Sequence, residues 1–137
     1  MLLPIGGPRQ QAYRWCVAEP VEGEQFFGTD TKAVSIYRAV GRRLLRFDDV
    51  DVRVSKSQVA FRARRGFAFA WHPGDYVATD VPFVLSLALP EPLDSHRVKE
   101  IAHPSPKTWM HHLELRLVKD VDRELLGWAE RAYRNAR

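Results

Sequence analysis

Residues 50–71 decide the fold, and they read VDVRVSKSQVAFRARRGFAFAW. Apolar and polar residues alternate along this stretch with a period of two, which is typical of strands that bury one face. The alternation predicts a first strand over 50–55, a second over 58–64 and a third over roughly 67–72. The connections between them are short, so neighbouring strands are expected to pair as antiparallel hairpins.

The first hairpin has a consistent register if residues 56–57 form a two-residue turn. That register pairs two valines with apolar residues: Val52 with Phe61 and Val54 with Val59. On the other face it pairs two aspartates with two arginines: Asp51 with Arg62 and Asp49 with Arg64. Opposite charges across two strands stabilise a sheet by a few tenths to about 1 kcal/mol. Three basic residues of this region are left without an acidic partner: Arg53, Lys56 and Arg65.

The next connection decides where three aromatic residues point, because one residue of register moves a whole strand to the other face. These residues are Phe67, Phe69 and Trp71. A two-residue turn would place them beside the arginines of the second strand, as a stacking surface for single-stranded nucleic acid. A three-residue turn would place them on the core face. Gly66 suits the left-handed last position of such a longer loop, so the core interpretation is favoured.

Helical periodicity marks two further segments. Residues 30–46 carry an apolar stripe at helical spacing, with Asp30 as the expected N-cap and arginines near the C-terminal end. Residues 120–135 carry a second stripe, with Asp120 as the expected N-cap. These two segments are predicted to be the helices of the domain.

Three more strands are expected between the hairpins and the last helix. Residues 83–89 are nearly all apolar, which indicates a central strand covered on both faces. Residues 97–102 are more polar and are expected near an edge, ending at the His-Pro-Ser-Pro stretch of 103–106. Residues 108–118 are the sixth expected strand.

The order of elements is helix, strands in hairpins, helix. It predicts an α+β fold with a mostly antiparallel sheet of five to six short strands. The N-terminal-half helix and the C-terminal helix are expected to pack on one face of that sheet. Residues 1–25 are predicted to form an irregular N-terminal arm, and residues 26–137 a single α+β domain.

Composition bounds the class of protein. The chain has 137 residues, 45% hydrophobic and 28% charged, as in an ordinary globular domain. No apolar run approaches the roughly 20 residues of a membrane helix, so no membrane partner is expected. The single cysteine, Cys16, cannot form an internal disulfide, and the first residues lack a signal peptide's basic region, so a cytoplasmic location is expected. A net charge of +4 permits attraction to nucleic acid or another anionic ligand.

Two adjacent histidines stand out in the sixth expected strand. Adjacent residues of a strand point to opposite faces, so His111 and His112 cannot bind one metal ion. His111 lies on the apolar side with Trp109, where a hydrogen-bonded core histidine is the favoured interpretation. The alternative is an acid–base or ligand-binding group in a pocket. His112 lies on the polar side with Arg116, where a solvated face is expected.

Motifs that would indicate a reaction or a cofactor do not occur in the sequence. No Cys-x-x-Cys, His-x-x-x-His or His-Glu-x-x-His spacing indicates a zinc site. No glycine-rich phosphate loop follows a strand, and Gly-x-Ser-x-Gly is absent. We therefore expect no metal, no cofactor and no catalytic residue, and a protein that is not an enzyme is favoured.

Several segments carry a resemblance to a known family: Phe26-Phe27-Gly28, VRVSKSQVAF at 52–61, VLS at 84–86, WMHHLEL at 109–115, and the closing Trp128, Ala132 and Tyr133. From residue 26 to the end, the chain resembles the bacterial family named domain of unknown function 5655. The resemblance implies a compact α+β domain without an established activity. Some relatives carry an N-terminal Cys-x-x-Cys ribbon completed by a later His and Cys, and residues 1–25 would be a degenerate remnant of it. Only Cys16 stands at a similar place, so the sequence departs from the zinc-binding pattern.

The leading functional hypothesis is a non-catalytic binding module whose basic hairpin meets an anionic partner such as nucleic acid. Its candidate residues are Arg53, Lys56 and Arg65, with His112 and Arg116 nearby. The alternative is a small-molecule pocket or enzyme centred on His111, with Lys56, Ser57 or Trp109. A third hypothesis is a scaffold or homodimer built on sheet edges, and the sequence leaves the oligomeric state open.

Overall fold

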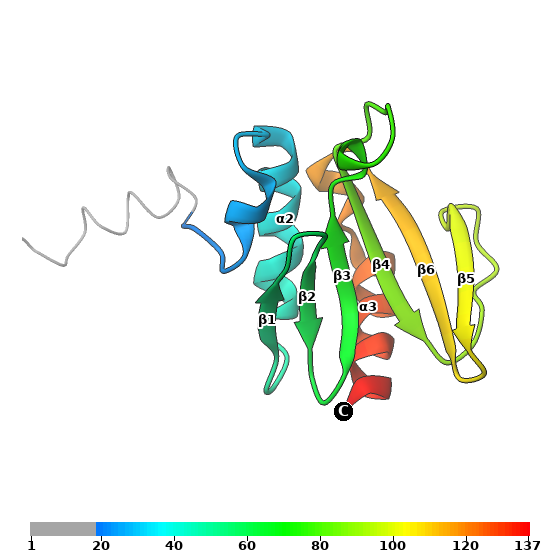
Figure 1. The fold of residues 1–137 in the computed structure, drawn as a ribbon. Helices are drawn as coiled ribbons and strands as arrows, with labels where there is room; N and C mark the ends of the chain where they lie inside the picture. The colour runs from blue at the N-terminus through cyan, green and yellow to red at the C-terminus, as the bar shows by residue number, and fades with distance from the viewer. Residues whose placement is uncertain (1–18) are drawn as a thin grey trace, which may run out of the picture.

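A six-stranded antiparallel sheet with two helices on one face makes up residues 19–137, the part of the chain that the computed structural model describes (Figure 1). The strands are β1 (Asp51–Val54), β2 (Val59–Arg62), β3 (Gly66–Trp71), β4 (Phe83–Leu89), β5 (Glu100–Ser105) and β6 (Thr108–Leu115). The sheet order is β1-β2-β3-β4-β6-β5, and all neighbours are antiparallel. The α-helices are α2 (Thr31–Leu44) and α3 (Arg123–Ala136). The predicted α+β class is confirmed.

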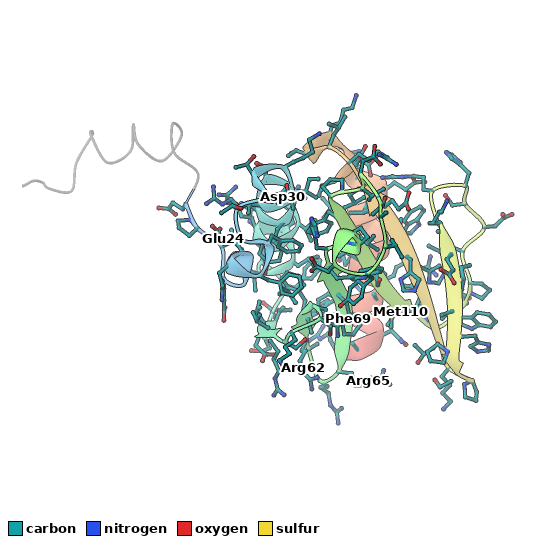
Figure 2. All side chains as sticks on the ribbon, turned by 45° about the horizontal axis from the view of Figure 1, so that its top comes forward. Glu24, Asp30, Arg62, Arg65, Phe69 and Met110 are labelled. Atoms are coloured by element: carbon teal, nitrogen blue, oxygen red, sulfur yellow. The ribbon has the colours of Figure 1, made fainter. Side chains whose placement is uncertain are left out.

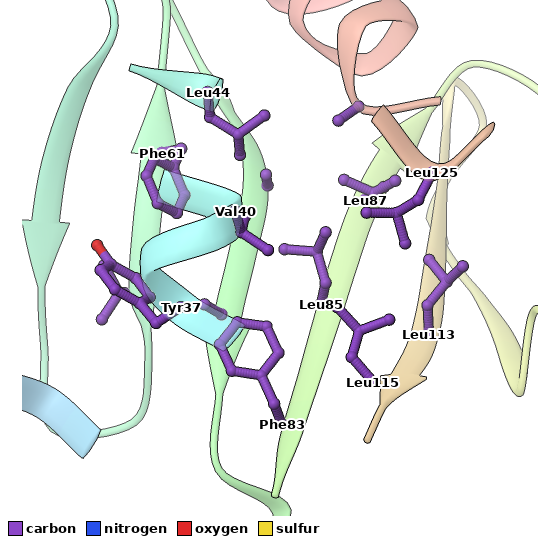
Figure 3. Close-up of a cluster of buried hydrophobic side chains, with 14 of the residues drawn as sticks. Tyr37, Val40, Leu44, Phe61, Phe83, Leu85, Leu87, Leu113, Leu115 and Leu125 are labelled. Carbon is purple, nitrogen blue, oxygen red and sulfur yellow. The ribbon is translucent and has the colours of Figure 1, made fainter. Parts of the chain in front are cut away.

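The hydrophobic core lies between the sheet and the two helices (Figure 3). Tyr37 and Leu44 from α2, and Leu125 from α3, are fully buried. They meet leucines of the central strands, among them Leu85 and Leu113. Fully burying one such side chain stabilises the fold by about 1.5–3 kcal/mol. One face of the sheet is therefore committed to the core.

Aspartates begin both helices. Asp30 accepts a hydrogen bond from the backbone N–H three residues on, at 3.1 Å, and is the N-cap that the sequence predicts. The second helix begins two residues later than expected, because Asp122 is its N-cap. Asp120 instead belongs to the short 3-10 turn η3 (Val118–Asp120) and accepts the backbone N–H groups of Arg116 and Leu117.

The register of the β1–β2 hairpin is the predicted one, with Val52 opposite Phe61 and Asp51 opposite Arg62. The β2–β3 hairpin differs from both predicted alternatives, because its register shifts between Phe61 and Arg62 in a β-bulge. A bulge places two successive residues of one strand against one residue of its neighbour. It therefore changes which face the following side chains occupy.

The bulge separates the three aromatic residues of β3. Phe67 is fully buried on the helix side, where its ring centroid lies 5.6 Å from that of Tyr133 in α3. Phe69 lies opposite Ala60, and it shares the face away from the helices with Trp71. The prediction that all three are core residues is correct for Phe67 and wrong for Phe69 and Trp71. Neither the two-residue nor the three-residue turn considered from the sequence includes this bulge, which inserts one extra residue into β3.

β4 is central in the sheet, as predicted, with β3 and β6 as neighbours. Among residues 19–137, its second face is covered by side chains around a cavity and not by another layer of helices. β5 is an edge strand, but it runs over residues 100–105 and so includes the His-Pro-Ser stretch that was expected to end it. Its pairing with β6 is irregular between Ala102 and Ser105, and an edge strand tolerates a proline.

Most of the predicted N-terminal arm lies outside the described part of the chain, including Cys16. Residues 19–23 lead into the short 3-10 helix η1 (Glu24–Phe27), the element before α2. Over residues 19–137, the structure contains no helix that is both long and apolar enough to cross a membrane.

Candidate functional site

The face of the sheet away from the helices carries a cavity of about 710 Å³. Its walls are mainly apolar and include Phe69 and Trp71 of β3 and Met110 of β6; Figure 2 labels Phe69 and Met110. The connection between β3 and β4 adds Tyr76 and Val77. Pockets of this size and character are typical of sites for small molecules.

A chain of hydrogen bonds crosses the floor of this cavity from β3 to β6. The indole N–H of Trp71 donates to Ser86 Oγ at 2.9 Å. Ser86 Oγ also lies 2.6 Å from Nδ1 of His112, its direct partner across β4 and β6. Ser86 is only 2% exposed, and His112 is half-buried. The chain therefore joins three strands and ends at an imidazole that faces the cavity.

Two acidic residues and one lysine line the cavity beside His112. Glu100 lies opposite His112 on β5, Glu114 follows on β6, and Lys99 precedes β5. Burial lowers the pKa of His112 below its ordinary range, and the Glu100 carboxylate partly opposes that shift. In the part of the chain that the structure describes, no cluster of three or more His, Cys, Asp or Glu side chains is placed to hold a metal ion.

His111 lies on the opposite face and is fully buried. Its Nε2 accepts the backbone N–H of Leu93 at 2.9 Å, and its Nδ1 lies 2.9 Å from the backbone oxygen of Trp109. These partners require a neutral ring with the hydrogen on Nδ1. His111 is thus a hydrogen-bonded core histidine, the interpretation that the strand pattern favoured, and it holds the β4–β5 connection to the sheet.

The four residues proposed for a pocket around His111 do not lie together. Ser57 lines the open-face cavity, while His111 is buried on the helix side of the sheet. Lys56 is exposed in the β1–β2 turn. Trp109 is half-buried, and its ring stacks on His103 with a centroid separation of 3.5 Å. The structure therefore moves the candidate pocket from His111 to its neighbour His112.

The predicted basic residues are also dispersed. Arg65 lies in the β2–β3 loop, where its guanidinium donates to the backbone oxygen of Asn135 at the C-terminal end of α3. Lys56 lies at the opposite end of β2. Arg116 forms an ion pair with Asp80 at 3.1 Å. These contacts give two of the arginines structural partners and separate them from the first hairpin.

Arg53 is exposed on β1, and its Nε lies 3.8 Å from a carboxylate oxygen of Asp51. The predicted register set Asp51 opposite Arg62, and the backbone has that register, but the Asp51 carboxylate approaches Arg53. An exposed pair at this distance contributes little to stability. The predicted pairing of Asp49 with Arg64 is wrong, because β1 begins at Asp51.

Three residues of the site were not singled out from the sequence: Trp71 as a cavity residue, Ser86 and Met110. Ser86 carried a usable signal, since it is the one polar residue in the apolar run of 83–89. A buried polar side chain needs a hydrogen-bond partner. Its partners, however, come from β3 and β6, and their identity depends on the strand order.

An antiparallel sheet with both helices on one face and a cavity on the other defines a small α+β domain with one open, hollowed face. The chain belongs to the family named domain of unknown function DUF5655, whose model matches residues 22–136. This confirms the resemblance found in the sequence. Comparisons with curated proteins and with solved structures each gave no significant match.

The free energy of unfolding should fall as the pH is lowered from 7.5 to 5. Burial lowers the pKa of His111 and of His112 below the ordinary value of about 6.5. Below about pH 6.5 the unfolded chain then binds more protons than the folded chain, so stability present above this pH is lost as pH falls. The fully buried His111 alone contributes a slope of at most about 1.4 kcal/mol per pH unit.

Urea unfolding at pH 7.5, 6.5 and 5.5 measures this slope. Carboxylates with lowered pKa values, such as Asp30 and Asp122, titrate at lower pH. The change in stability between pH 7.5 and 5.5 is therefore expected to come from the histidines. A His111→Asn variant should show a shallower slope than the wild type. An unchanged slope in that variant would show that His111 is not the group that resists protonation.

Proposed function

We propose that this chain is a small-molecule-binding domain whose ligand occupies the open-face cavity beside His112. The observation that carries the proposal is the joint occurrence of three features in one place. A cavity of about 710 Å³ has aromatic walls, and a hydrogen-bonded polar chain from Trp71 through Ser86 to His112 crosses its floor. Binding sites for small molecules combine an apolar cavity with a few convergent polar groups in this way.

The geometry around His112 supports a binding function better than it supports nucleophilic catalysis by Ser86. Ser86 is the hydroxyl nearest to His112, but it is 2% exposed. One of its lone pairs already accepts the indole N–H of Trp71. A nucleophile must reach the reacting atom of a substrate. The Ser86 hydroxyl is instead buried beneath the cavity by its two hydrogen-bond partners. Ser86 therefore supports the position and tautomer of His112.

The hypothesis of an extended anionic partner has less support. Such a partner binds through a continuous basic surface. Arg65 and Arg116 have structural partners, and Lys56 and Arg65 lie at opposite ends of β2. The cavity itself is lined by two acidic residues and one lysine.

The test uses prodan, a neutral naphthalene dye whose emission shifts to the blue on entering an apolar site. Wild-type protein should shift its emission, and Trp71→Leu should weaken dye binding about tenfold, because a wall of the cavity is lost. Trp109→Leu is the matched control, since Trp109 lies outside the cavity and stacks on His103. It should leave dye binding unchanged.

Labelled single-stranded RNA at low and physiological salt provides the competing test. If RNA binds at physiological salt and Arg53→Ala/Lys56→Ala weakens it while prodan does not bind, the anionic-partner hypothesis replaces the present one. Equal loss of prodan binding in Trp71→Leu and Trp109→Leu would also contradict the proposal, since it would indicate a general loss of structure.

A further inference from the structure

The hydrogen-bond chain beneath the cavity sets which group of His112 meets a ligand. An indole N–H can only donate, so Ser86 Oγ must accept from Trp71. The Ser86 hydroxyl hydrogen then needs its own acceptor. Among residues 19–137, His112 Nδ1, at 2.6 Å, is the other side-chain atom that Ser86 Oγ contacts.

The arrangement that satisfies every atom has Ser86 donating to Nδ1 of His112. The opposite arrangement, with the hydrogen on Nδ1, would leave the hydroxyl hydrogen of a side chain that is 2% exposed without an acceptor. An unsatisfied buried donor is unfavourable. The neutral imidazole therefore carries its hydrogen on Nε2, and a protonated ring carries one there as well. In either charge state, Nε2 is a hydrogen-bond donor.

The charged groups around the cavity disfavour an anionic ligand. Glu100 and Glu114 are acceptors only, and Lys99 is the one cation among the lining residues that the structure describes. An anion would meet two negative charges and one positive charge. A neutral ligand with its own N–H groups can instead donate to the carboxylates.

The rings around the polar chain favour a flat ligand. The Trp71 ring meets those of Tyr76 and His112 edge-on, at interplanar angles of 72° and 90° and centroid distances of 5.8 Å and 6.0 Å. Aromatic side chains pack against planar rings in stacked or edge-to-face arrangements, and three aromatic rings of this kind line the cavity. Phe69 and Met110 add apolar surface at the same site.

We infer that the ligand of this cavity is a neutral planar ring with a carbonyl next to an N–H, as in a lactam or an imide. Its carbonyl oxygen accepts from His112 Nε2, and its N–H faces the carboxylate side of the cavity. This inference rests on the proposed function, and it adds the chemical class of the ligand. It also assigns His112 as the residue that selects for a hydrogen-bond acceptor.

The first part of the test needs no ligand. Long-range proton–nitrogen NMR spectra of the whole chain should show His112 with a hydrogen on Nε2 and none on Nδ1 at pH 7.5. His111 is the internal reference, because its contacts require the opposite tautomer, with the hydrogen on Nδ1. A hydrogen on Nδ1 of His112 would overturn the inference.

The second part compares three bicyclic probes of similar size: naphthalene, 2-quinolone and 2-naphthoate. They carry no polar group, a lactam and a carboxylate, respectively. Titrations followed through the indole N–H signal of Trp71 should show 2-quinolone binding about tenfold more tightly than naphthalene. The carboxylate should bind no better than naphthalene. In His112→Phe the preference for 2-quinolone should disappear while naphthalene still binds.

The outcomes separate the two proposals. Equal binding of all three probes, or tightest binding of 2-naphthoate, keeps the binding function but overturns the ligand class. A preference for 2-quinolone that survives in His112→Phe overturns the role of His112. If none of the probes binds, the proposed function fails and the inference fails with it.

Discussion

His111→Leu should lower the free energy of unfolding by about 2–4 kcal/mol. The histidine is fully buried and bonds the backbone N–H of Leu93 and the backbone oxygen of Trp109, each at 2.9 Å. Leucine fills similar space but bonds neither group. Each polar group left unsatisfied costs about 1–3 kcal/mol, and the connection between β4 and β5 loses its attachment. Urea unfolding at pH 7.5 measures the change.

The adjacent residue supplies a matched control. His112→Leu removes an imidazole from the same strand, but this side chain is half-buried and has Ser86 as its hydrogen-bond partner. The expected loss of stability is about 1 kcal/mol, and prodan, whose carbonyl can accept from His112, should bind about tenfold more weakly. His111→Leu should bind prodan normally under conditions where it is folded. Equal losses of stability in the two variants would contradict the assignment of one histidine to the core and the other to the cavity.

Gly23→Ala should destabilise the fold by about 2–4 kcal/mol. Gly23 has a φ of 96°, in the left-handed region that costs a residue with a Cβ roughly 1–2 kcal/mol. A Cβ here would collide with the Tyr37 hydroxyl and lie 2.9 Å from Val59 Cγ1. That hydroxyl donates to the backbone oxygen of Glu22 and belongs to a fully buried side chain. Overpacking a core adds about 1–3 kcal/mol.

Gly127→Ala is the control for the glycine substitution. Gly127 lies within α3, and a Cβ there would meet nothing within 4 Å. Alanine in place of an exposed helical glycine stabilises by about 0.5–1 kcal/mol. Thermal unfolding of both variants should therefore move the midpoint in opposite directions. A loss in the free energy of unfolding below about 1 kcal/mol in Gly23→Ala would contradict the left-handed backbone of Gly23 and its close packing against Tyr37.

Local patterns in the sequence were enough for much of the fold. A period of two and a short turn predict the register of β1 with β2, because alternation and loop length together set a hairpin. Asp30 as the cap of α2 follows from its carboxylate, which serves backbone N–H groups only a few residues away. His111 as a core residue follows from its position among alternating apolar residues. Each of these features depends on neighbours close in the chain.

The site depends on contacts between distant segments. The backbone N–H groups of Arg64 and Arg65 both donate to the oxygen of Ala136, which ties the β2–β3 loop to the end of α3. The loop and its bulge are thus part of a contact between segments about 70 residues apart, and the bulge sends Phe69 and Trp71 to the open face.

The sequence by itself therefore determined the fold class, the first hairpin, one helix cap and the family. Only the tertiary structure decided that Trp71, Ser86 and His112 form one polar chain under a cavity, because β4 lies between β3 and β6 in the sheet. The alternation of apolar and polar residues predicts which side chains share a face within one strand. Strand order and the bulge decide which strands bring those faces together, and both arise from the packing of the whole domain.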